Sequence, residues 1–110
     1  MDDLKKLKCI PCSGATPPLP YDEITELARQ LNGWQVVNNH HLTKSYSFSD
    51  FKAALEFVVG VSEIAEREGH HPDICFGWGR AELTIFTHAI DGLSTSDFVL
   101  AAKIDSELST

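Results

Sequence analysis

Basic residues are scarce in this 110-residue chain, because nine Lys and Arg stand against sixteen Asp and Glu and give a formal net charge of -7 at pH 7. A surface with this acidic excess repels phosphate groups, so the composition argues against nucleic acids and anionic membranes as partners. The sequence also lacks an apolar run long enough to span a bilayer, and its N-terminus has no signal-peptide core. We therefore expect a soluble, cytoplasmic protein.

Cysteine is also sparse, with three residues in the chain. Residues 1–20 are interrupted by proline and glycine and are predicted to form an arm before a single domain, residues 21–110. Cys9 and Cys12 form a Cys-x-x-Cys pair in this arm, but the pair follows no strand and opens no helix, which argues against a thioredoxin-like role. One such pair is only half of a structural zinc site. A plain extension or a weak surface thiol pair is the favoured interpretation, and Cys75 is expected to be a small buried hydrophobe within a strand.

Turn signals and apolar spacing divide the remaining chain into helices and strands. Helices are predicted over 21–31, 49–69 and 94–108, and strands over 34–37, 41–48, 74–78 and 81–88. Two hairpins joined by a helix favour an α+β fold, in which three helices pack on one face of a four-stranded antiparallel sheet. The predicted order of elements is α-β-β-α-β-β-α.

Apolar spacing also predicts which helix faces are buried. In the second helix the stripe expected to face the core consists of Phe51, Ala54, Leu55, Val58, Ser62 and Ala65. In the last helix the expected core stripe is Leu100, Ala101, Ile104 and Leu108. Phe98 and Ala102 lie partly outside that stripe and are predicted to serve either the core or an oligomer contact. Trp78 is expected to pack in the core or on the hairpin.

Three of the five histidines lie between Glu66 and Asp97. Gly69 suits the position just past a helix end, so His70 and His71 should leave the C-terminus of the second helix. Glu66, four residues before His70, is expected to share its face. Ser94 and Asp97 have the spacing of a capping box, which would hold the Asp97 carboxylate at a helix start, where it can orient a histidine or a ligand.

The turn of the second hairpin determines whether these histidines meet. If Gly79 and Arg80 form a two-residue loop, Trp78 pairs with residue 81 and His71 lies opposite His88. Cross-strand neighbours have Cβ atoms roughly 4.5 to 5.5 Å apart, so two imidazoles could then act on one small molecule. A bulge or a shifted turn would change this register.

The spacing Glu66-x3-His70-His71-Pro72-x5-Trp78-x9-His88-x8-Asp97 resembles the signature of the pterin-4a-carbinolamine dehydratases. The resemblance extends from about Tyr21 to Leu108 in the order and lengths of the elements. It implies an enzyme that dehydrates 4a-hydroxytetrahydropterin to quinonoid dihydropterin and so supports recycling of a tetrahydrobiopterin-type cofactor. It also implies assembly into a homodimer or homotetramer.

One acid and one base suffice for this dehydration, without a metal or a redox cofactor, and histidine can supply both near neutral pH. The resemblance implies that His70 and His88 donate protons, while His71 holds the substrate and can serve as the base. It further implies that Glu66, Thr87 and Asp97 bind the pterin or orient the histidines.

Two alternatives remain open from the residues. His70, His71 and His88 could be nitrogen ligands of a catalytic zinc ion, although neighbouring residues rarely aim both imidazoles at one ion. The chain could also be a binding module, because some animal members of the family act as dimerisation partners of a transcription factor. His40 and His41 are predicted to be exposed turn residues, because no carboxylate or cysteine accompanies them at ligand spacing.

Overall fold

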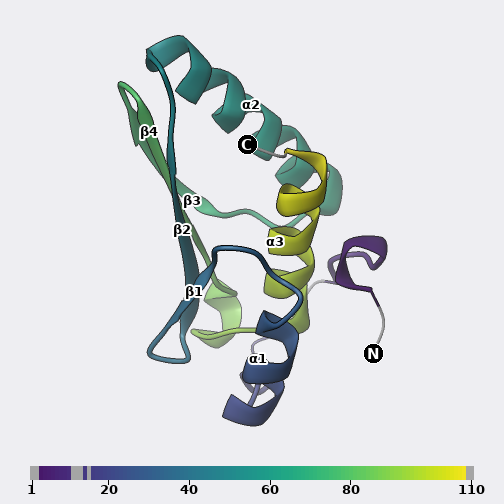
Figure 1. Ribbon diagram of the computed structural model, residues 1–110. Coiled ribbons are helices and arrows are strands. Elements are labelled where there is room, and N and C mark those ends of the chain that lie inside the picture. Colours follow the sequence, from purple (N-terminus) through teal and green to yellow (C-terminus); the bar gives the residue numbers. More distant parts are fainter. Residues whose placement is uncertain (1–2, 11–13, 15, 109–110) are drawn as a thin grey trace.

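The computed structural model describes residues 3–10, 14 and 16–108 and has the predicted α+β architecture (Figure 1). Its elements are η1 (Leu4–Lys6), α1 (Tyr21–Ala28), β1 (Gln35–Val37), β2 (His41–Ser47), α2 (Phe51–Glu68), β3 (Asp73–Gly77), β4 (Arg80–Ile85), η2 (His88–Ile90) and α3 (Thr95–Glu107), where η marks a 3-10 helix. The four strands form one antiparallel sheet in the order β1-β2-β4-β3. The predicted fold class and the order α-β-β-α-β-β-α are therefore confirmed.

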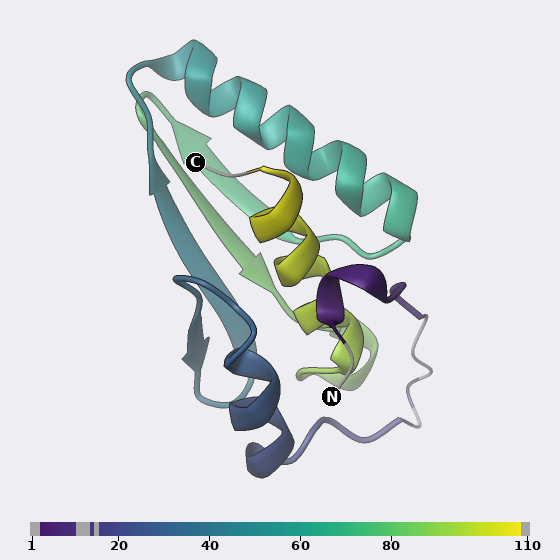
Figure 2. The ribbon, with the colours of Figure 1, turned by 45° about the vertical axis from the view of Figure 1, so that its right-hand side comes forward.

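The helices share one face of the sheet (Figures 1 and 2). Alternate residues of β2 and β4 point to this face, and Leu42, Leu83 and Ile85 are fully buried there. The alternation follows from the two-residue period of a strand, which turns every second side chain away from water. Figure 2 also shows η1 lying against α3 on the side away from the sheet. The core is thus the space between the sheet and the α2 and α3 layer.

The second helix, α2, begins and ends where local signals place its caps. The Asp50 side chain accepts a hydrogen bond from the Ala53 N–H at 2.8 Å, and Gly69 adopts the left-handed conformation, with φ of 66°, just past the helix end. The buried face of the helix was predicted only in part, because Ala54 and Ala65 are buried as predicted but other members of the predicted stripe are not. The observed stripe is Ala54, Phe57, Val61, Ile64 and Ala65, whereas Phe51 and Leu55 are 45% and 40% exposed.

The aromatic packing on β2 explains why the other stripe is buried. The ring of Phe57 lies 4.3 Å from that of Tyr46 and 5.2 Å from that of Phe48, measured between centroids. Both stripes have helical spacing, and the neighbouring sheet selects the one that carries Phe57. Aromatic side chains bury large apolar areas, so packing of Phe57 on these two rings turns its face of the helix toward the sheet.

The last helix, α3, is buried on nearly all sides rather than along one stripe. Leu100, Ala101 and Ile104 are buried as predicted, but Phe98 and Ala102 are buried as well. The elements η1, α1 and α2 all contact α3, which is why it lacks an exposed apolar face. Phe98 and Ala102 therefore belong to the core, which was one of the two predicted alternatives, and they are not available for an oligomer contact.

The β3–β4 hairpin differs from the predicted register. Gly77 pairs with Arg80, so the loop is Trp78-Gly79, with Gly79 at φ of 73° in the region that favours glycine. His71 and His88 are consequently not opposed across a ladder, because β3 begins at Asp73 and β4 ends at Ile85. Trp78 is a turn residue with 74% exposure rather than a packed one. Cys75 points to the open face and is exposed, contrary to prediction.

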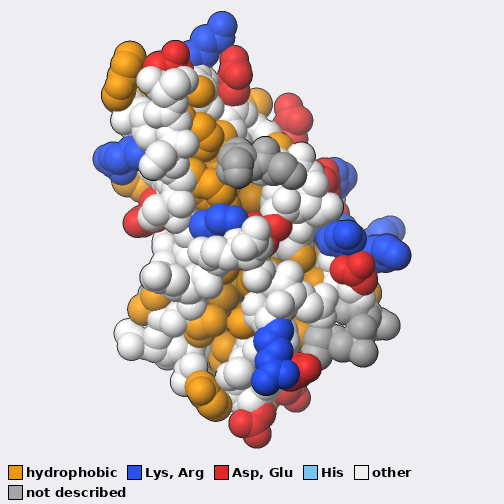
Figure 3. All heavy atoms as spheres, in the orientation of Figure 1, with side chains coloured by type: hydrophobic (Ala, Val, Ile, Leu, Met, Phe, Trp, Pro, Cys, Tyr) orange, Lys and Arg blue, Asp and Glu red, His pale blue; other side chains and the backbone are white. Residues whose placement is uncertain are grey.

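The surface mixes apolar and charged side chains, and Figure 3 shows both kinds interspersed on one face. The exposed large hydrophobic residues include Phe51, Leu55 and Val59, which recur every four residues along α2 and form what we call the α2 stripe. In the described part of the chain, no helix combines the length and the apolar character needed to cross a membrane.

Candidate functional site

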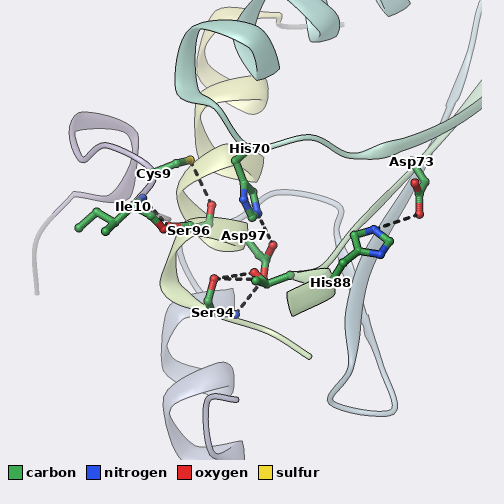
Figure 4. A network of polar contacts seen from close by, with 9 residues as sticks. Cys9, Ile10, His70, Asp73, His88, Ser94, Ser96 and Asp97 are labelled. Carbon is green, nitrogen blue, oxygen red and sulfur yellow. Dashed lines mark hydrogen bonds and ion pairs between the residues drawn. The ribbon is translucent and has the colours of Figure 1, made fainter. Parts of the chain in front are cut away.

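His70 and Asp97 form a pair inside the protein (Figure 4). The left-handed turn at Gly69 ends α2, and the His70 N–H donates to the Ala65 carbonyl at 3.2 Å. This cap directs the His70 ring toward the start of α3, where its Nε2 lies 2.5 Å from Oδ1 of Asp97. The His70 side chain is 15% exposed and that of Asp97 is 0% exposed. His70 and Asp97, which lie near opposite ends of the segment from Glu66 to Asp97, therefore meet in a largely buried pair.

The Asp97 carboxylate is held by the predicted capping box. Its Oδ2 accepts the Ser94 N–H at 2.8 Å and the Thr87 hydroxyl at 2.9 Å. The Thr87 and Ser94 hydroxyls also contact each other at 2.8 Å. Both carboxylate oxygens are thus engaged by groups of the protein, so the structure gives Asp97 the role of orienting His70.

Thr87 has its polar atoms engaged in the same way. Its hydroxyl donates to Asp97, its N–H donates to the Gly92 carbonyl at 2.8 Å, and its carbonyl accepts from Ile90 and Gly92. These contacts fit a residue that positions the turn before α3. Direct contact of Thr87 or Asp97 with a substrate stays a prediction.

His71 lies outside this buried pair and has its own carboxylate. Its Nε2 is 2.5 Å from Oε2 of Glu66, and both side chains are largely exposed. The prediction that Glu66 shares a face with His70 is therefore wrong, because Gly69 breaks the helix before His70 and rotates the next residues. Beside the pair is a groove of about 240 Å³ lined by Ser62, Ala65, Glu66, His71, Pro72 and Ile74.

His88 approaches a carboxylate that the sequence analysis missed. Its Nε2 lies 3.9 Å from Oδ2 of Asp73, and both side chains are largely exposed. Figure 4 shows the His88 ring turned toward Asp73 rather than toward Asp97. The ring of Phe86 packs on that of His88 with centroids 4.1 Å apart. The sequence signal that could have found Asp73 is its place in the hairpin: it begins β3, and β3 pairs with β4, the strand that leads to His88.

The three predicted catalytic histidines therefore have the same kind of neighbour, a carboxylate facing Nε2. Among the residues that the structure describes, none hydrogen bonds to Nδ1 of His70 or of His71. An imidazole held by a carboxylate on one nitrogen can accept or donate a proton at the other. Within the described ranges no three His, Cys, Asp or Glu side chains are arranged to hold a metal ion. That arrangement gives the three-histidine zinc alternative no support.

His40 and His41 also have unexpected partners. Nε2 of His40 lies 2.7 Å from Oδ1 of Asp91, and its Nδ1 lies 3.1 Å from Nδ1 of His41. The His40 ring packs on Phe86 with centroids 4.7 Å apart. His40 lies in a turn as predicted, but His41 opens β2 and both histidines are half-buried rather than exposed. The carboxylate of Asp91, just past η2, reaches His40 only through the tertiary fold.

Comparison with curated proteins points to one family. The family model described as pterin 4 alpha carbinolamine dehydratase matches residues 17–107. A relative from Rubrobacter xylanophilus is 59% identical over 105 residues, which cover 96% of this chain and 98% of the relative. One from Alkaliphilus metalliredigens is 51% identical over 110 residues, with 99% of each chain covered. Both carry the provisional name pterin-4-alpha-carbinolamine dehydratase.

Solved structures agree with this result. A protein from Brucella melitensis, described as a transcriptional coactivator/pterin dehydratase, has a TM-score of 0.75 and 32% identity, covering 81% of this chain and 96% of its own. A pterin dehydratase-like RuBisCO assembly factor of the alpha-carboxysome has a TM-score of 0.60 at 20% identity and so shows the fold alone. By its sequence and its fold, this chain belongs to the pterin-4a-carbinolamine dehydratase family.

Proposed function

We propose that this protein is a hydro-lyase that dehydrates 4a-hydroxytetrahydropterin to quinonoid dihydropterin and thereby supports recycling of a tetrahydrobiopterin-type cofactor. The observation that carries the proposal is the buried His70–Asp97 pair. Two further histidine–carboxylate pairs, His71–Glu66 and His88–Asp73, involve the residues that follow His70 and Thr87 in the sequence. Family membership supports the reaction class, because the similar curated relatives are provisionally named for it.

The chemistry needs two proton movements. The C4a–O bond breaks, and its electron pair leaves with the oxygen, which takes a proton from an imidazolium and departs as water. A base removes the proton of the neighbouring ring nitrogen, and the electrons of that N–H bond form the new C=N bond. We assign proton donation to His70 and His88 and assign substrate holding and proton removal to His71. Asp97 orients His70 by occupying its Nε2.

Substrate contact is assigned to the exposed residues of the site. The Glu66 carboxylate faces the groove beside His71 and can accept hydrogen bonds from the amino and ring N–H groups of a pterin. Asp73 faces His88 as an acidic neighbour, with its Oδ2 3.9 Å from Nε2 of the histidine. Thr87 contributes through Asp97.

The test measures dehydration of a carbinolamine that a pterin-dependent hydroxylase generates in a coupled ultraviolet assay. Wild type is expected to accelerate the reaction over buffer, and His88→Ala is expected to lower kcat by about a hundredfold, the usual contribution of one positioned acid or base. His41→Ala removes a histidine outside the proposed site and serves as the matched control, with activity retained. Circular dichroism establishes that each variant is folded. Absence of any wild-type acceleration would refute the enzymatic function.

We also propose that the protein assembles into a homodimer or homotetramer through the α2 stripe, Phe51, Leu55 and Val59. These side chains are 40 to 47% exposed on one face of a helix whose opposite face is already packed on the sheet. Contiguous exposed apolar residues of this kind are typical of interfaces. The edges of the sheet at β1 and β3 offer a second pairing surface.

Leu55→Glu is expected to reduce the molar mass measured by light scattering after size exclusion, because a charge within an apolar contact loses its water. Lys52→Asp, on an exposed position of the same helix, is the matched control and should leave the mass unchanged. An unaltered mass in Leu55→Glu would exclude the α2 stripe as the contact. Binding of a different protein through this stripe is the second candidate function, and such a complex would be insensitive to His88→Ala.

A further inference from the structure

The N-terminal arm is packed on the domain. The Leu4 side chain is fully buried in the core, and its N–H donates to Oε1 of Gln30 at 3.0 Å. The largely buried Lys103 ammonium of α3 donates to the Lys5 carbonyl at 3.0 Å. Residues 4–10 therefore form a docked segment, which we call the clamp; Cys12 lies outside the described residues.

The end of the clamp is bonded to both α2 and α3, and Figure 4 shows its contacts with Ser96 of α3. The Ile10 N–H donates to the Ser96 hydroxyl at 2.8 Å, and that hydroxyl donates to the Ile10 carbonyl at 3.0 Å. The Cys9 N–H donates to Oε1 of Glu68 at 3.1 Å, and its thiol donates to the Ser96 carbonyl at 3.4 Å. Cys9 is thus bonded to both α2 and α3, and Ile10 is bonded to α3.

The two anchor points adjoin the His70–Asp97 pair. Glu68 is the last residue of α2 and lies two positions before His70, and Ser96 immediately precedes Asp97 in α3. We propose that the clamp holds the end of α2 against the start of α3, and that Glu68 and Ser96 are positioning residues for the His70–Asp97 pair. The effect of the clamp on catalysis rests on the proposed dehydratase function, whereas its effect on the geometry of the His70–Asp97 pair does not.

The environment of Cys9 supports a structural role for this thiol. Burial raises its pKa to about 12, the Glu68 carboxylate contributes in the same direction, and the Lys103 ammonium opposes them. The thiol therefore stays protonated near neutral pH and can donate to the Ser96 carbonyl. A protonated, half-buried thiol also reacts slowly with alkylating reagents, which makes Cys9 a reporter of clamp docking.

The first experiment uses that reporter. In a full-length background with Cys12→Ser and Cys75→Ser, Cys9 is the sole thiol, and its reaction with iodoacetamide at pH 8 is followed by mass spectrometry. Adding Ser96→Ala should accelerate alkylation by about tenfold or more, because release of the clamp exposes the thiol. Ser106→Ala, an exposed serine of the same helix, is the matched control and should leave the rate unchanged.

The second experiment reads the pair itself. The Nε2–H proton of His70 in its buried bond to Asp97 should give a downfield proton NMR signal, assigned by its loss in His70→Asn. Ser96→Ala and Glu68→Ala should broaden this signal and lower kcat by about tenfold with little change in KM, as expected when a catalytic group is misplaced slightly. Glu68→Gln retains an oxygen acceptor for the Cys9 N–H, so this variant should keep a sharper His70 signal and a higher kcat than Glu68→Ala.

The outcomes separate the clamp from the dehydratase activity. Faster alkylation with an unchanged His70 signal and unchanged kcat in folded protein would overturn the clamp proposal. An unchanged alkylation rate in Ser96→Ala would overturn it as well. A wild type without dehydratase activity would refute the proposed function, while the NMR signal would still show whether the clamp positions the pair.

Discussion

Asp97→Asn is expected to lower kcat for carbinolamine dehydration by about a thousandfold, within the roughly hundred- to ten-thousandfold contribution of a positioned acid or base. The Asp97 carboxylate accepts from the Ser94 N–H, the Thr87 hydroxyl and Nε2 of His70. The side-chain amide in Asp97→Asn would have the same shape but only one acceptor oxygen, because its other terminal group is NH2. That NH2 group would face either the His70 N–H or the Ser94 and Thr87 donors, and two donors cannot form a hydrogen bond. His70 would then change its tautomer or its orientation, and either change disables proton transfer.

The matched control is Asp105→Asn. Asp105 is also largely buried and accepts hydrogen bonds from the Asn32 N–H, the Trp34 indole and the Lys44 ammonium. None of these partners is one of the three histidines of the proposed site. This control variant should lose stability yet keep a kcat within about threefold of wild type, because the pairs that orient the histidines are intact. A folded Asp97→Asn protein with similarly small losses would contradict the orienting role of Asp97.

Phe98→Ala is expected to lower the free energy of unfolding by about 3 to 5 kcal/mol, the range for truncating a fully buried phenylalanine. Phe98 is wholly enclosed, and it follows Asp97 directly in α3. The loss combines the removal of apolar contacts with a cavity that the surrounding sheet and helices only partly close. Urea unfolding followed by circular dichroism, with linear extrapolation to water, measures this change.

Tyr21→Ala provides the comparison for that substitution. Tyr21 is an aromatic residue of similar size at the start of α1, but its side chain is mostly exposed. Its replacement should change the free energy of unfolding by less than about 1 kcal/mol, because little apolar area returns to water. Equal effects in the two variants would show that α3 is not the centre of the core.

Local features of the sequence determined the boundaries and order of the elements. The Gly69 stop and the Ser94–Asp97 capping box each depend on residues within a few positions, and both are formed as predicted. The Asp50 cap at the start of α2 is equally local. The strands follow from two-residue alternation in the same local way. The residue spacing that resembles the dehydratase signature also lies within a window of about thirty residues, so the family could be identified from it.

The face of α2 that is buried could not be read from spacing. Two stripes of that helix are apolar, and only the approach of Tyr46 and Phe48 on β2 selects the one with Phe57. The hairpin register was equally ambiguous, because Gly77 and Gly79 permit several turns and the sheet accepts the one in which Gly79 takes a positive φ.

The sequence by itself therefore determined the α+β element order, the caps and the identity of the histidines that carry the proposed chemistry. The tertiary structure decided which carboxylate each histidine meets, with Asp73 opposite His88 and Asp91 opposite His40. It also decided that the arm docks across α2 and α3. The physical reason is separation along the chain: caps and turns depend on neighbours, whereas these contacts join segments that only the packed sheet and helices bring within hydrogen-bonding reach.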